Sequence, residues 1–281
     1  MEAAVKTKTI GYNRLRAYID PLQFKERKKD SRFVRKNIHF QEIINLYKLD
    51  SSLRWLIFRA IEKIEVAIRT RIAYEYAMET NESHWFMNPT LYHKKEDFTK
   101  ILGKIEENVK RSDEEFITYY RQKYDVPALP PAWMSLEILS FGGLGKLLAA
   151  LKNQTKPKAR VAEAFGLPNA TILVNWILAI AALRNYCAHH SRIWNRRFML
   201  IVLPYSTHKP FIDSHIIKSQ TIKPNKIFAL LCCIKYLLNG IDHNNDFYKE
   251  LKTILASGGR LLNLKEMGFP PDWETFPVWK E

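Results

Sequence analysis

A permanent cation and a titratable base stand close together at the end of an apolar stretch of this chain. The segment reads Arg184-Asn185-Tyr186-Cys187-Ala188-His189. The planar guanidinium of arginine can hold two oxygens of a phosphate, and imidazole, with an unperturbed pKa of about 6.5, gives and takes protons near neutrality. Cleavage of an RNA phosphodiester needs both properties. The segment therefore predicts a phosphodiester-cleaving site whose catalytic candidates are Arg184, Asn185 and His189.

The spacing of Arg184 and His189 restricts where in a fold this site can lie. Residues five apart on an α-helix are separated by roughly 140° in projection, at about 100° per residue, so the two side chains do not share a face in the middle of a helix. They can act together if the helix ends near Ala188 and His189 turns towards Arg184. They can also line a groove shared with a second copy of the chain. Both alternatives place the site at a helix terminus.

The residues that follow His189 strengthen the functional interpretation. By themselves, Arg184 and His189 would ordinarily be a solvated arginine and a histidine at the edge of the core. A dense polar cluster at the end of an apolar helix instead favours an active or RNA-binding site, and its supporting members are His190, Arg192 and Asn195. His190 either assists His189 or packs against the protein.

An aromatic side chain, Trp194, stands among three arginines of the same segment, Arg192, Arg196 and Arg197. Aromatic faces stack on unpaired bases and arginine pairs with phosphate, so these residues are candidates for an RNA-binding strip. The alternative is that Trp194 belongs to the core and the arginines face water.

The charge of the chain predicts a polyanionic partner, with nucleic acid first. The net charge is +15, from 44 basic and 29 acidic residues. Residues 1–36 hold eleven Lys or Arg against four Asp or Glu, and Lys28, Lys29 and Arg32 in this run either contact RNA or belong to a solvated arm. Between Glu163 and Asp213 there is no acidic residue. The sequence thus predicts that no carboxylate opposes a phosphate backbone at the motif.

The motif and its continuation resemble a known family. R-N-x-x-x-H is the signature of the HEPN ribonucleases, and the run from Leu183 to Asn195 is similar to the AbiD/AbiF abortive-infection branch. The resemblance extends over about residues 10–279. It includes four further segments in the same order: Tyr47–Asp50 with Leu53-Arg54, Ile61–Arg69, Leu129–Trp133 with Glu137 and Ser140–Gly142, and Met267–Pro270 with Trp273.

The resemblance implies an all-α fold, a HEPN-like helical bundle with an additional N-terminal helical lobe. It implies a metal-independent endoribonuclease of bacterial phage defence, in which the RNA 2′-OH attacks the adjacent phosphate and leaves a 2′,3′-cyclic phosphate. His189 would then act as general base or acid, and Arg184 would stabilise the charge of the transition state. Asn185 would orient His189 or a phosphate oxygen. Neither a metal nor another cofactor is expected.

The expected partners are RNA and a second copy of the chain. The motif occurs once, so two copies would have to meet to supply two histidines, which predicts a homodimer. AbiF-like proteins are associated with a neighbouring non-coding RNA. The alternative function is therefore a non-catalytic RNA-binding protein that forms a ribonucleoprotein with a structured non-coding RNA. A third alternative, an interaction module in which the cluster organises a dimer, would leave the charge unexplained.

The cysteines and the apolar runs indicate a cytoplasmic protein without a membrane partner. Cys187, Cys232 and Cys233 are an odd set with one adjacent pair, which cannot form a disulfide framework and fits a reducing compartment. The longest apolar run, from Ala170 to Leu183, is shorter than the ~20 residues of a bilayer span. We expect this run to be a buried core helix.

Helical periodicity dominates the chain, and no strand alternation stands out. Two lobes are expected, residues 1–126 and 127–281, which could equally share one core; the prolines between residues 125 and 131 predict a stiff connector. Four further expectations concern single segments. They are a long amphipathic helix from Ser51 to Glu79 capped by Ser51 or Ser52, a helix break at Phe141-Gly142-Gly143, the motif helix from about Asn169 to His189 or His190, and helices at Lys226–Leu238 and Asn245–Ala256.

Overall fold

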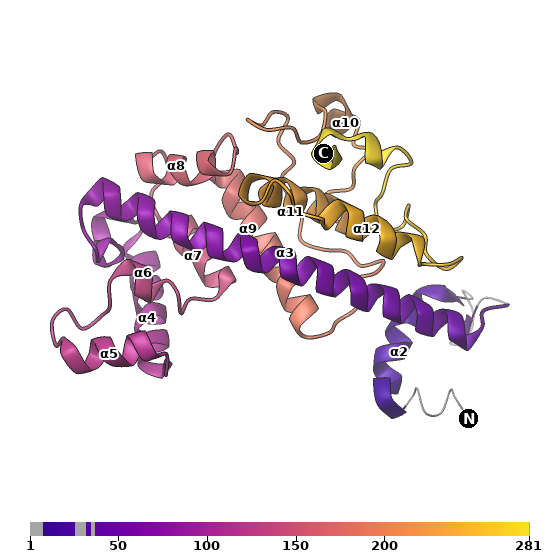
Figure 1. Ribbon diagram of the computed structural model, residues 1–281, viewed down its shortest axis with the longest axis horizontal. Coiled ribbons are helices and arrows are strands. Elements are labelled where there is room, and N and C mark those ends of the chain that lie inside the picture. Colours follow the sequence, from indigo (N-terminus) through magenta and orange to yellow (C-terminus); the bar gives the residue numbers. More distant parts are fainter. Residues whose placement is uncertain (1–7, 26–31, 35–36, 281) are drawn as a thin grey trace.

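The computed structural model describes residues 8–25, 32–34 and 37–280. Within these ranges the fold is helical, as the sequence predicts, and the single strand ladder pairs β1 (Gln23–Lys25) with β2 (Arg32–Val34) in antiparallel register. Figure 1 shows that one helix, α3 (Phe40–Thr80), crosses the whole molecule and that the other helices are arranged along it.

The remaining helices are distributed along α3 in a simple order. In Figure 1, α2 lies at one end of α3, α4 to α6 lie at the other, and α11 and α12 run beside its middle part. Their bounds are α2 (Tyr12–Ile19), α4 (Lys95–Arg111), α5 (Glu115–Lys123), α6 (Ala132–Ser135), α7 (Phe141–Ala150), α8 (Lys156–Ala164), α9 (Ala170–Ala188), α10 (Ser214–Lys218), α11 (Ile227–Ile241) and α12 (Phe247–Ala256). Single 3-10 turns lie at Asp20–Leu22, Trp85–Met87, Pro89–Leu91, Trp273–Thr275 and Pro277–Trp279.

The long helix α3 begins well before the predicted cap. Its start is at Phe40, where the Glu42 carboxylate accepts a hydrogen bond of 2.9 Å from the backbone N–H of His39. This hydrogen bond satisfies the backbone N–H of His39, a donor at the helix start that would otherwise be left unpaired. Ser51 is therefore an interior residue of α3, and the prediction that it or its neighbour caps the helix is wrong.

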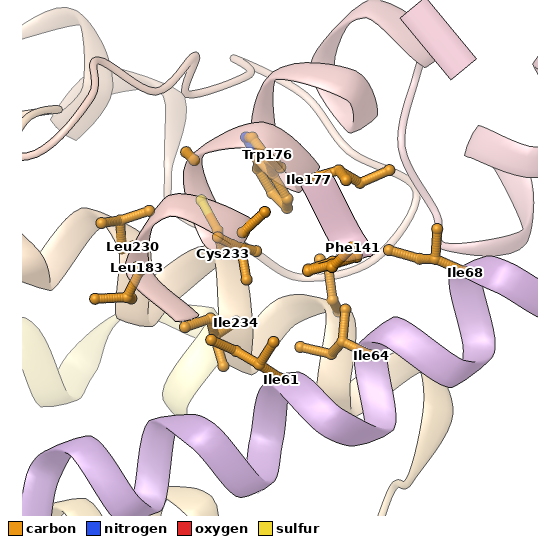
Figure 2. Packing of buried hydrophobic residues seen from close by; sticks show 14 of the residues in the cluster. Ile61, Ile64, Ile68, Phe141, Trp176, Ile177, Leu183, Leu230, Cys233 and Ile234 are labelled. Carbon is orange, nitrogen blue, oxygen red and sulfur yellow. The ribbon is translucent and has the colours of Figure 1, made fainter. Parts of the chain in front are cut away.

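The motif helix α9 is the central helix of the bundle. It begins after Asn169, whose side chain caps it by accepting a hydrogen bond of 3.1 Å from the N–H of Ile172. Because α9 is apolar nearly all round, it packs against several neighbours at once: α3, α7, α8 and α11. Figure 2 shows buried side chains of α3, α7, α9 and α11 converging. The predicted bounds and burial of the motif helix are confirmed.

By length and composition, α9 is also the one helix in the described ranges that could cross a membrane. Half of the apolar window that gives this result is buried inside the protein. Its contacts with α3, α7, α8 and α11 are those of a core helix.

The glycine-rich segment after Ser140 lies inside a helix, so the predicted break at Phe141-Gly142-Gly143 is wrong. The Ser140 hydroxyl accepts a hydrogen bond of 3.2 Å from the N–H of Gly143 and caps α7. A Cβ atom at Gly145 would lie 2.9 Å from side-chain carbons of both Ile177 and Leu178. The glycine there lets α7 approach α9 closely, which fixes the depth of the motif helix in the bundle.

Buried side chains from both sides of residue 126 belong to one hydrophobic cluster, which extends from Tyr18 to Trp279. Helices α11 and α12 match the two late helices expected from the sequence, and both pack directly on α3. The division of the chain near residue 126 stays a prediction.

Candidate functional site

The end of α9 lies where the spacing of the motif requires it. The helix stops at Ala188, and the N–H of His189, the first residue beyond it, still bonds the carbonyl of Asn185 at 3.0 Å. His190 then adopts a left-handed backbone with φ of 54°, and its N–H bonds the carbonyl of Cys187 at 3.0 Å. The chain reverses at this point, as at many helix C-termini. His189 and His190 are therefore both exposed at the helix end.

The three catalytic candidates remain available for a ligand. Asn185 and His189 are exposed, and Arg184 is half-buried with its guanidinium carbon 5.6 Å from the ring centroid of Phe58 on α3. Among the described residues, no hydrogen bond or ion pair involves the side chain of Arg184, Asn185 or His189. The structure brings them to one helix terminus, and in the described part of the chain no side-chain hydrogen bond or ion pair of theirs is used to hold the fold.

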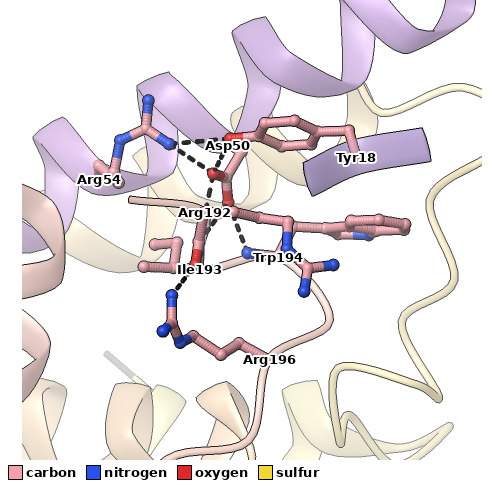
Figure 3. A network of polar contacts seen from close by, with 7 residues as sticks. All are labelled: Tyr18, Asp50, Arg54, Arg192, Ile193, Trp194 and Arg196. Atoms are coloured by element: carbon pink, nitrogen blue, oxygen red, sulfur yellow. Dashed lines mark hydrogen bonds and ion pairs between the residues drawn. The ribbon is translucent and has the colours of Figure 1, made fainter. Parts of the chain in front are cut away.

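The loop after the motif is held by a buried carboxylate. Asp50 of α3 is fully buried and accepts hydrogen bonds from the N–H of Trp194 at 2.6 Å and of Ile193 at 3.3 Å. It also accepts from the hydroxyl of Tyr18 and from the guanidinium of Arg54, both at 2.5 Å. Figure 3 shows these donors converging on the carboxylate from α2, α3 and the loop.

The electrostatics of this network follow from its burial. Burial raises the pKa of the Asp50 carboxyl, while the hydrogen bond from Tyr18 and the charge of Arg54 oppose that rise. Burial likewise raises the pKa of the Tyr18 hydroxyl well above its ordinary value. The buried Asp50 carboxylate is thus well supplied with hydrogen-bond donors, and it connects the segment after His189 to α2 and α3.

The structure corrects the prediction that Trp194 stacks on RNA. Its side chain is only 1% exposed and stacks on Tyr18, with ring centroids 6.4 Å apart. The guanidinium carbon of Arg192 lies 5.7 Å from the Trp194 ring centroid. Since no face of the indole is exposed, the core alternative for Trp194 holds. Arg192 is itself half-buried, and burial lowers its pKa.

The other residues of the cluster are used in different ways. Arg196 donates to the carbonyl of Arg192 at 3.0 Å, and its guanidinium carbon lies 3.9 Å from the ring centroid of Tyr186. Asn195 donates to Glu266 at 2.7 Å and accepts from Lys226 at 3.3 Å, so both ends of its amide are engaged. Arg197 is exposed.

The tertiary structure changes the charge environment expected at the motif. Asp50 and Glu266 both reach the acid-free segment, so the prediction that no carboxylate opposes phosphate there is wrong. Two lysines that the sequence reasoning missed, Lys223 and Lys226, also join Arg197. Burial lowers the pKa of Lys226, the charges of Lys223, Arg197 and Arg192 lower it further, and the charge of Glu266 opposes them. This like-charge cluster could be found only from the fold, because its lysines lie in a separate loop.

Some of the predicted contacts lie beyond what the structure describes. Lys28 and Lys29 are outside the described residues, and of Arg32 only the backbone, in β2, is described. Within the described ranges, no group of three or more His, Cys, Asp or Glu side chains is arranged to hold a metal ion.

Comparison with known proteins identifies the family of this chain. A family model described as "Abi-like protein" matches residues 6–195, which includes α3, the whole of α9 and the motif. The chain therefore belongs to the Abi-like family, as the sequence resemblance predicts. Membership in this family implies abortive-infection phage defence. No curated protein and no solved structure matches the chain.

Proposed function

We propose that this chain is a metal-independent endoribonuclease of HEPN type whose reaction takes place at the end of α9. The observation that carries the proposal is a contrast within one segment. The side chains of Asn195 and Trp194 are engaged in the fold, whereas Arg184, Asn185 and His189 reach the surface without hydrogen-bond or ion-pair partners in the described part of the chain. Polar groups that do not hold the fold are the ones left for a substrate.

The reaction follows from the chemistry of these side chains. The RNA 2′-OH attacks the adjacent phosphorus while one His189 removes its proton, and the 5′-oxygen of the next nucleotide leaves with a proton from a second histidine. The products are a 2′,3′-cyclic phosphate and a 5′-OH. Arg184 stabilises the negative charge of the transition state, and Asn185 orients the phosphate or the imidazole. Proton transfer of this kind typically contributes about 10²–10⁴-fold.

A homodimer supplies the second histidine, and α9 offers a face for it. Val174, Leu178 and Ala182 are only partly buried and form a stripe on α9 that leads to Asn185. Beside this stripe, the side chain of Asn175 bonds the backbone of residues 200 and 202 and fixes an extended segment on which Leu200 is 64% exposed. A two-fold interface through this face would join two copies of the motif helix.

A second candidate function is RNA binding without cleavage, as a ribonucleoprotein with a structured non-coding RNA. The cluster of Arg197, Lys223 and Lys226 favours it, because this charge suits phosphate binding whether or not His189 reacts. We place either function in the cytoplasm, since the three cysteines are free and buried, a state that suits a reducing compartment.

The experiment that separates the two functions removes one imidazole. His189→Ala should abolish RNA cleavage and leave RNA affinity within a few-fold, because a neutral imidazole adds little to phosphate binding. Arg184→Ala should damage both steps. His190→Ala should give a partial loss if it assists and none if it packs, and His215→Ala, an exposed histidine of α10, is the matched control.

Wild-type cleavage should also survive EDTA and leave cyclic phosphate ends. Cleavage by His189→Ala at the wild-type rate would remove the enzymatic proposal. The same conclusion would follow if the wild type, freed of copurified RNA, cuts no RNA, and the ribonucleoprotein function would then replace it. Light scattering of Leu200→Glu, a change at an exposed residue of the same face, tests the dimer: a monomer that still cleaves would contradict the need for a second histidine.

A further inference from the structure

A small pocket opens beside the motif, between α3 and the end of α9. Its volume is about 220 Å³, and its walls include Arg54, Trp55 and Phe58 from α3 and Cys187, Ala188 and His190 from the motif segment. Pockets for drug-sized ligands usually begin at about 300 Å³, so this one has room for a single ring system and little more.

Two aromatic side chains on the α3 wall of the pocket connect it to Arg184. Trp55 is 63% exposed, although α3 buries most of its other large apolar side chains. A single exposed apolar residue needs no explanation. Here, however, Phe58 lines the same pocket one turn further along α3, and Arg184 lies over the Phe58 ring. A planar group against Trp55 would thus lie next to the arginine that we assign to the phosphate.

The polar side of the pocket suits part of an anionic molecule. Among the residues that the structure describes, no acidic side chain lines it, and Asp50, the partner of the lining residue Arg54, is fully buried. His190 reaches the pocket because its left-handed backbone, uncommon for a residue with a side chain, turns the chain back after α9. Both ring nitrogens of His190 lack a hydrogen-bond partner within the described residues, so they can meet a polar ring edge.

We propose that this pocket binds one unpaired nucleobase of the RNA, stacked on Trp55, while Arg184 holds the phosphate attached to that nucleotide. The proposal rests on the proposed function, since it names a subsite of the same reaction. Every base has a π-face, so stacking on tryptophan accepts all four bases, and any preference comes from the ring edge that faces His190. Trp55 therefore takes the role that the sequence reasoning gave to Trp194.

Binding is tested in a His189→Ala background, where RNA is not consumed. Anisotropy of a labelled single-stranded oligoribonucleotide should show that Trp55→Ala weakens affinity about 10-fold, in line with loss of one base–aromatic stack, while Trp55→Phe stays within about 3-fold. Trp133→Ala is the matched control, because Trp133 is similarly exposed at 55% but lies on α6, outside the pocket.

An RNA with an abasic nucleotide beside the cleaved bond tests whether a base fills the pocket. Removal of the base should weaken binding to the parent protein as much as Trp55→Ala does. In the Trp55→Ala protein, removal of the base should cause no further loss of affinity. If the Trp55→Ala protein binds the intact and the abasic RNA with the affinity of its parent, the base subsite is overturned. Cleavage by the wild type would then still support the proposed ribonuclease function. If Trp55→Ala and the abasic nucleotide both weaken binding and the wild type does not cleave, the base subsite is supported and the proposed reaction is overturned. Conversion of the protein to a monomer by Trp55→Ala would make the ring a protein contact and overturn the proposal.

Discussion

Replacing Asp50 with alanine should destabilise the protein more than any surface change near the motif. The substitution leaves the buried guanidinium of Arg54 without its counter-charge and removes the acceptor of the Trp194 N–H. Breaking a buried ion pair from one side costs about 3–5 kcal/mol, and a buried unsatisfied donor costs about 1–3 kcal/mol. These terms overlap, so we expect a loss of about 4 kcal/mol from a total stability that is typically about 5–15 kcal/mol.

The assay is urea unfolding followed by tryptophan fluorescence, since the Trp194 indole stacks on Tyr18 in the same network. The Asp50→Ala midpoint should fall well below that of the wild type, and Asp50→Asn, which keeps one acceptor for the loop, should lose less. Asp50→Leu combined with Arg54→Met removes both charges and should be more stable than Asp50→Leu alone. A loss below about 1 kcal/mol for Asp50→Ala, or strict additivity of the pair, would refute the argument that this carboxylate holds the loop.

Three further predictions use other parts of the fold. In thermal unfolding, Gly145→Ala should destabilise the protein by about 1 kcal/mol net, because crowding against α9 outweighs the gain in helix propensity. Gly103→Ala should instead stabilise it, because no atom of another part of the fold lies within 4 Å of the added Cβ. Hydrogen bonds from Arg260 lower the pKa of Glu42 to about 2, so their stabilisation is complete above the ordinary value of 4.5 and is lost as pH falls through about 2. The difference in unfolding stability between the wild type and Arg260→Gln should therefore shrink towards the acid end, where only the bond from Arg260 to the carbonyl of Asn37 remains. The slope of log K against log[salt] for single-stranded RNA should become shallower by about 0.7 for each phosphate that Arg197→Ala or Lys223→Ala leaves without its cation, and an unchanged slope would exclude this cluster from the interface.

Local signals in the sequence were enough to place the motif helix, although they put the start of α3 too late. The side chain of Asn169 caps the first turn of α9, and the motif helix ends at Ala188, close to the predicted end at His189 or His190. The family resemblance was also readable in advance, because the motif and its neighbouring residues are contiguous along the chain. These signals act over one or two turns, so no knowledge of the rest of the fold is needed to read them.

Long-range packing, by contrast, determines which side chains of the site are buried and which are free. Trp194 and Trp55 are the same residue type, yet one is 1% exposed and the other 63%. The difference comes from Tyr18 and Asp50, which lie far from Trp194 in sequence. Tyr18 stacks on the indole of Trp194, and Asp50 accepts a hydrogen bond from its backbone N–H. The same holds for Lys223 and Lys226, which come close to Asn195 and Arg197 only because the chain folds back. The burial of a side chain and the electrostatic potential at a site depend on residues from many elements of the fold. Local periodicity in the sequence does not specify which of these residues come into contact.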